Sequence, residues 1–119
     1  MKTKIFIAVF AAVGLGVLPV VALAQPTYLA CVLDGGSVGP VRINFTTDES
    51  AGTVSIHIVS SGHSRTVNAA FTPDRVLVDE RTVRWMIDRT NLQFSRTIKS
   101  VNGTEYGQCE IQKPPQRAF

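Results

Sequence analysis

Two histidines are the side chains of this chain that could act as a catalytic base. His57 alternates with apolar neighbours, so its side chain is expected to point outward from a strand. His63 lies in the serine-rich polar stretch 60–65, which is typical of a surface turn. A serine hydrolase needs a Ser, a His and an orienting acid assembled in space. We expect solvated histidines here, and a small hydrolase using His57 or His63 is the least favoured alternative.

Adjacent carboxylates occur twice, as Asp48-Glu49 and as Asp79-Glu80. Both pairs fall in predicted turns, and neighbouring strand residues face opposite ways, so neither pair focuses two carboxylates on one point. The glycines lack the Lys-Ser/Thr sequence of a phosphate-binding loop. We therefore predict a protein that is not an enzyme, with no metal site and no cofactor.

The candidate contacts for a ligand or partner are four polar side chains: Arg84, Asp88, Arg96 and His63. Arg96 shares one face of its predicted strand with apolar residues. An arginine in such a place needs a carboxylate partner or a position at a barrel mouth. Asp88 or Glu110 is the expected partner.

The cysteines, Cys31 and Cys109, lie near the two ends of the chain that follows the first 24 residues. In an oxidising compartment an isolated pair is most simply a single disulfide, and a reactive or lipidated thiol is the alternative. A loop that spans nearly the whole domain would gain roughly 4 kcal/mol in the chain-entropy account.

The first twenty-four residues have the layout of a secretory signal peptide. Lys2 and Lys4 precede the apolar stretch 5–22, and small residues at 22 and 24 suit cleavage before Gln25. A retained anchor and a lipoprotein are the alternatives. The leader predicts a helix over 1–24 that is removed, a periplasmic or secreted protein, and no stable membrane anchor.

Cleavage would change the charge balance. Without Lys2 and Lys4 the chain has ten basic and nine acidic residues, a net charge of +1 instead of +3. That is poor support for nucleic-acid binding, which requires a clustered basic face. The length suits one domain over 25–112, followed by a disordered tail at 113–119 and found as a monomer.

Apolar residues alternate with polar ones along the whole exported part of the chain, as in half-buried strands. About eight strands are predicted, at 28–33, 41–45, 54–58, 67–71, 76–78, 83–87, 92–99 and 104–111. Gly, Asn and Asp between them suit tight turns. We predict an all-β fold, a small antiparallel barrel or sandwich. Closure would bring the first and last strands together, as the disulfide requires.

The segment 85–92, Trp-Met-Ile-Asp-Arg-Thr-Asn-Leu, resembles one in small exported bacterial proteins of uncharacterised function. In those proteins an aromatic strand enters a turn that often has Gly where Asn91 stands. The resemblance implies a fold type more than an activity. From the pattern itself, Trp85 should pack in the core, and 88–91 should form the turn to the next strand.

The most favoured function is an exported, non-catalytic binding or inhibitory module of the bacterial envelope or secretome. Its partner would be an unidentified protein or small molecule, contacted through turns on a disulfide-closed scaffold. The alternative is a structural subunit of a surface assembly, which predicts an unpaired edge strand open to β-augmentation.

Overall fold

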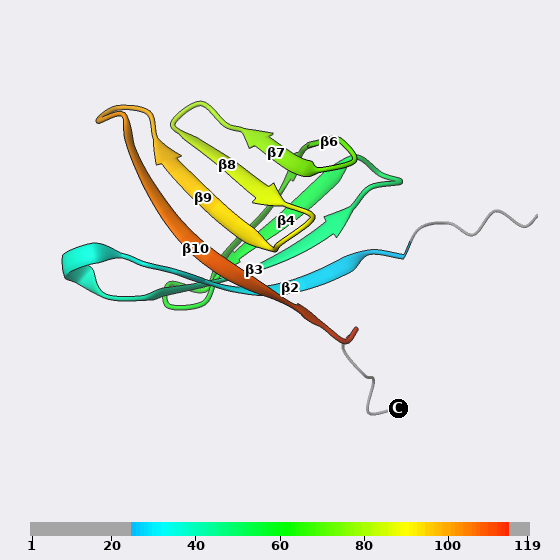
Figure 1. The fold of residues 1–119 in the computed structure, drawn as a ribbon, viewed down its shortest axis with the longest axis horizontal. Coiled ribbons are helices and arrows are strands. Elements are labelled where there is room, and N and C mark those ends of the chain that lie inside the picture. The colour runs from blue at the N-terminus through cyan, green and yellow to red at the C-terminus, as the bar shows by residue number, and fades with distance from the viewer. Residues whose placement is uncertain (1–24, 115–119) are drawn as a thin grey trace, which may run out of the picture.

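A single antiparallel sheet of nine strands curls into a nearly closed barrel (Figure 1). The computed structural model describes residues 25–114. The strand order is β5-β4-β3-β2-β10-β9-β8-β7-β6, which confirms the all-β prediction and decides for a barrel. The strands are β2 (Thr27–Leu33), β3 (Val41–Asp48), β4 (Thr53–Ile58), β5 (His63–Asn68), β6 (Ala70–Phe71), β7 (Arg75–Asp79), β8 (Val83–Asp88), β9 (Gln93–Ile98) and β10 (Gly103–Gln112), with a 3₁₀ turn, η3 (Gly36–Val38), after β2.

The first and last strands lie side by side, as the sequence predicts (Figure 1). β2 and β10 pair antiparallel, and Cys31 stands directly opposite Cys109. The two cysteines form a disulfide with a Cα–Cα distance of 4.0 Å, and both are buried. The bond therefore lies inside the barrel and ties two strands that are 78 residues apart in sequence.

The core follows the period-two pattern, because every second residue of a strand points into the barrel. Phe45 meets the rings of Trp85 and Phe94 edge-on, with centroids 5.5 and 5.7 Å apart. This confirms that Trp85 packs in the core. The buried apolar residues are Leu29, Cys31, Leu33, Ile43, Phe45, Val54, Ile56, Val76, Val78, Trp85, Ile87, Phe94 and Cys109.

The barrel is not closed by backbone pairing, because β5 and β6 form the two edges of the sheet. A side-chain bridge crosses this seam. Arg65 of β5 donates from Nε and Nη2 to the two carboxylate oxygens of Glu80, at 2.7 and 2.6 Å. Glu80 directly follows β7, so the bridge joins the edge strand β5 to the strands on the other side of the seam.

Most strands end within a few residues of the predicted bounds, and three differences have a visible cause. The predicted strand 67–71 is split at Ala69, whose backbone N–H donates to the carbonyl of Gly52 instead of to a ladder partner. His63 belongs to β5 rather than to a turn, because it pairs with Ile58. β9 begins one residue later than expected, because Leu92 has a left-handed φ of 63°.

The predicted leader, residues 1–24, lies outside the described residues, as does most of the predicted tail. Residues 113 and 114 follow β10 without regular structure. Between residues 25 and 114 the structure has no helix that is long and apolar enough to cross a membrane.

Candidate functional site

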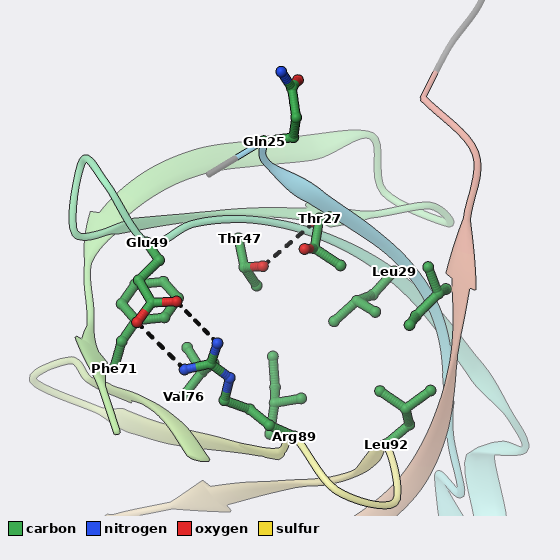
Figure 2. A pocket seen from close by; sticks show the side chains of 11 residues that line it. Gln25, Thr27, Leu29, Thr47, Glu49, Phe71, Val76, Arg89 and Leu92 are labelled. Atoms are coloured by element: carbon green, nitrogen blue, oxygen red, sulfur yellow. Dashed lines mark hydrogen bonds and ion pairs between the residues drawn. The ribbon is translucent and has the colours of Figure 1, made fainter. Parts of the chain in front are cut away.

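One end of the barrel opens into a cavity of about 300 Å³ (Figure 2). It lies where β3 and β8 end and β2 begins, so residues far apart in sequence line it. We call this end the mouth. Its apolar lining is Leu29, Phe71, Val76, Ile87, Leu92 and Ile111, and its polar lining is Gln25, Thr27, Thr47, Glu49 and Arg89. An apolar chamber with a few converging polar groups is the usual form of a small-molecule site.

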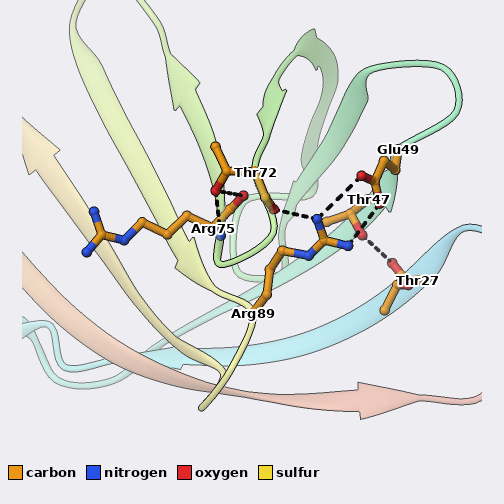
Figure 3. Close-up of polar contacts among 6 residues, drawn as sticks. All are labelled: Thr27, Thr47, Glu49, Thr72, Arg75 and Arg89. Atoms are coloured by element: carbon orange, nitrogen blue, oxygen red, sulfur yellow. Dashed lines mark hydrogen bonds and ion pairs between the residues drawn. The ribbon is translucent and has the colours of Figure 1, made fainter.

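Arg89 is the cation of the mouth, and its guanidinium stands among the lining side chains (Figure 2). It comes from the turn after β8, whereas its partner Glu49 comes from the turn after β3. Nη2 donates to Glu49 at 2.9 Å, and Nη1 donates to the carbonyl oxygen of Thr72 at 2.6 Å (Figure 3). The guanidinium carbon also lies 5.9 Å from the ring centre of Phe71. Arg89 thus joins three turns around the opening.

The hydroxyls of the mouth come from the ends of two paired strands. Thr47 is buried, and its hydroxyl donates to the carbonyl of Thr27 at 3.4 Å (Figures 2 and 3). Thr27 itself is exposed at the start of β2. The two threonines therefore put polar groups on the side of the opening across from Phe71.

Leu92 reaches the mouth through an uncommon backbone conformation. Its φ of 63° is left-handed, which costs a residue with a β-carbon about 1 kcal/mol. The turn is held in place by Leu92 N–H donating to the carbonyl of Asp88 and by Cys109 N–H donating to the carbonyl of Leu92. Strain of this kind gathers at binding and catalytic sites.

The opposite end of the barrel is occupied by a polar cluster around Glu80. The indole N–H of Trp85 donates to Glu80 Oε1 at 3.0 Å, beside the two bonds from Arg65. These partners lower the pKa of Glu80; the Arg65 hydrogen bond is the largest cause, partial burial opposes it, and the charge of His63 adds a little. Glu80 is therefore a fixed, charged acceptor in this structure.

Arg96 does pair with a carboxylate, but neither expected partner is the one found. Its Nε and Nη2 donate to Glu105 Oε1, the former at 2.8 Å. Arg96 and Glu105 face each other across the β9–β10 hairpin. The prediction that Asp88 or Glu110 pairs with Arg96 is wrong, because the register of the β9–β10 hairpin places Glu105 opposite Arg96. The guanidinium carbon also lies 5.9 Å from the Trp85 ring.

The other candidate contacts are dispersed. Asp88 holds its own turn by accepting from the N–H and hydroxyl of Thr90, which lowers the pKa of Asp88. Arg84 is half exposed and lies 3.7 Å from the carboxylate of Asp79. His63 is exposed at the start of β5. The structure does not bring the four candidate residues together at one place.

The histidine of the hydrolase alternative has a serine partner that the sequence did not indicate. His57 Nδ1 lies 2.6 Å from Ser64 Oγ, across the β4–β5 ladder on a solvated face. Within residues 25–114, no carboxylate is hydrogen-bonded to this histidine. The pair also lies on a strand surface rather than at a turn that could expose a nucleophile.

Sequence reasoning missed the mouth altogether. Arg89 was placed in a turn and Glu49 among solvated carboxylates, but nothing in either local sequence shows that the two turns meet. One available signal was the side-chain type, because arginine suits planar pairing with a carboxylate. Comparison of the chain with protein-family models, curated proteins and solved structures found no match.

Proposed function

We propose that this protein is an exported, non-catalytic binding module that holds a small molecule in the mouth of its barrel. The cavity at the mouth carries the proposal, because its volume of about 300 Å³ lies at the lower end of the range for small-ligand pockets. Six apolar side chains line the cavity, and an apolar group that removes them from water would bind favourably. Arg89, Thr27 and Thr47 provide the polar points that would orient it.

The rest of the scaffold suits such a role. The disulfide between Cys31 and Cys109 fixes β2 against β10, and β2 carries Thr27 and Leu29 to the mouth. A site built on strands that are held in this way changes little when a ligand enters, which lowers the entropic cost of binding.

Binding of the neutral fluorescent probe N-phenylnaphthylamine tests the proposal. We expect its fluorescence to rise with the protein and the rise to be lost in Thr27→Trp, which places a large ring across the opening. Thr66→Trp is the matched control, since Thr66 is an exposed strand threonine of β5 away from the mouth. Equal probe binding by Thr27→Trp and the unaltered protein would overturn the proposal.

The hydrolase alternative rests on His57 and Ser64. Turnover of p-nitrophenyl acetate that is abolished by Ser64→Ala would favour it over a binding module. We expect no such loss, because the pair lies on a solvated strand face.

The assembly-subunit alternative rests on β5, which is an edge of the sheet. However, the Arg65–Glu80 bridge already lies across that seam. We expect a monomer on size-exclusion chromatography with light scattering. A concentration-dependent polymer that Arg65→Ala enhances would favour the subunit instead.

A further inference from the structure

The hydrogen bonds of three arginines in this barrel differ in which edge of the guanidinium they use. Arg65 binds Glu80 through Nε and Nη2, and Arg96 binds Glu105 through the same two nitrogens. This edge carries two parallel N–H groups and is well shaped for a carboxylate. In both residues the edge is fully occupied.

Arg89 uses its other edge. Nη1 and Nη2 face Glu49, at 3.5 and 2.9 Å, and Nη1 also donates to the Thr72 carbonyl. Nε of Arg89 has no hydrogen-bond acceptor among residues 25–114, and Nη2 donates only to Glu49 there. One parallel pair of N–H groups is thus left without a protein partner in the described part of the chain.

The direction of this edge links it to the cavity. Glu49 and Phe71 lie to one side of the guanidinium, and Thr27, Leu29 and Leu92 lie to the other (Figure 2). Because the Nη1–Nη2 edge faces Glu49, the Nε edge faces the interior of the mouth. A carboxylate there would have Thr27 near it and apolar side chains behind it.

We propose that the ligand of the mouth is an amphiphile with a carboxylate, which the Nε–Nη2 edge of Arg89 receives while an apolar body rests on Leu29, Val76 and Leu92. This inference rests on the proposed function and adds the chemical class of the ligand. The ligand's carboxylate would share Arg89 with Glu49, so the two anions oppose each other across the guanidinium. Glu49 therefore weakens binding and sets a limit on affinity.

Calorimetric titration with octanoate, octanol and octylamine tests the inference, since these share a chain and differ in head group. We expect octanoate to bind best. Arg89→Lys keeps the charge but loses the paired N–H groups, so octanoate should bind about tenfold more weakly while octanol is unaffected. Glu49→Gln should tighten octanoate binding about threefold, because it removes the opposing charge.

Arg75→Lys is the matched control, because Arg75 is the first residue of β7 and its side chain extends away from Arg89 (Figure 3). It should leave all three ligands unchanged. Equal binding of octanoate and octanol would overturn the carboxylate inference and leave the binding module standing. Tighter binding of octylamine would also overturn it, since Glu49 would then be the recognition group. Equal binding of N-phenylnaphthylamine by Thr27→Trp and the unaltered protein, measured separately, is what would overturn the proposed function itself.

Discussion

Glu80 is the common acceptor of the polar cluster at the end of the barrel opposite the mouth. Its carboxylate accepts from Arg65 across the seam and from the indole of Trp85 in the core. Its side chain is 20 % exposed, so solvent replaces these contacts poorly. Removal of the carboxylate would leave a half-buried guanidinium and a buried N–H group without an acceptor.

Glu80→Ala should accordingly lower the free energy of unfolding by about 2 kcal/mol. Asp79→Ala is the matched control, because Asp79 is the adjacent carboxylate but pairs with Lys99 on the surface. The control should cost less than the Glu80 variant. Urea unfolding followed by Trp85 fluorescence measures both variants. Equal losses of unfolding free energy would contradict the role of Glu80 as the acceptor for Arg65 and Trp85.

The same residue predicts a pH dependence. The pKa of Glu80 is held below its ordinary value of 4.5, chiefly by Arg65. A carboxyl group with a lowered pKa stabilises the fold above its unfolded pKa, and that contribution is lost as the pH falls through the folded pKa. The stability difference between the unaltered protein and Glu80→Ala should therefore be full at neutral pH and shrink below about pH 4.5. A stability difference between the two proteins that stays constant below pH 4.5 would refute the lowered pKa of Glu80.

Among the elements, β10 shows how close packing depends on a missing side chain. Gly107 faces the core opposite Phe94, and a β-carbon there would overlap the Phe94 ring and the Val32 carbonyl oxygen. The backbone oxygen cannot move without disturbing the β2–β10 ladder. This glycine thus makes room for the aromatic cluster at the centre of the barrel.

Gly107→Ala should destabilise the protein by about 2 kcal/mol because of this overpacking. Gly103→Ala on the same strand is the control, since an added β-carbon there would meet only Val101, at 3.5 Å. Thermal unfolding should show a clear loss for Gly107→Ala and little change for Gly103→Ala. A larger loss of stability in Gly103→Ala than in Gly107→Ala would show that the loss does not come from the contact with Phe94.

The sequence predicts the strands well because alternation records which face of each strand is buried. The sequence predicts less well which charged side chains pair with one another. Arg96 and Glu105 are related by the short β9–β10 turn, and counting outward from that turn would have paired them. The meeting of Arg89 with Glu49 could not be counted in this way, because it depends on the curvature of the whole sheet. Leu92 shows a third limit, since a left-handed leucine runs against local preference.

At the scale of the whole molecule, the barrel has two unlike ends. Glu80, Trp85 and Arg65 occupy one end, whereas Arg89 and a cavity occupy the other. β8 runs from the first end to the second, so a single strand connects the two. The disulfide joins β2 to β10, which are neighbours in the middle of the sheet and come from the two ends of the described chain.

A Cys31→Ala/Cys109→Ala double variant should therefore lose up to about 4 kcal/mol of stability, because the bond closes a loop of nearly the whole domain. Thermal unfolding of the variant, and of the unaltered protein with and without reductant, measures the effect. We expect the reduced protein and the double variant to unfold at similar, lower temperatures. Unchanged melting in both would show that the barrel holds without its covalent link.

The measurement that bears most directly on the binding site is the location of a bound ligand. Nuclear Overhauser effects from the protons of N-phenylnaphthylamine to protein methyl groups report which side chains touch it. The account predicts contacts with Leu29, Val76 and Leu92 inside the mouth. Contacts confined to Val32 and Val59, which lie exposed outside the core, would contradict it.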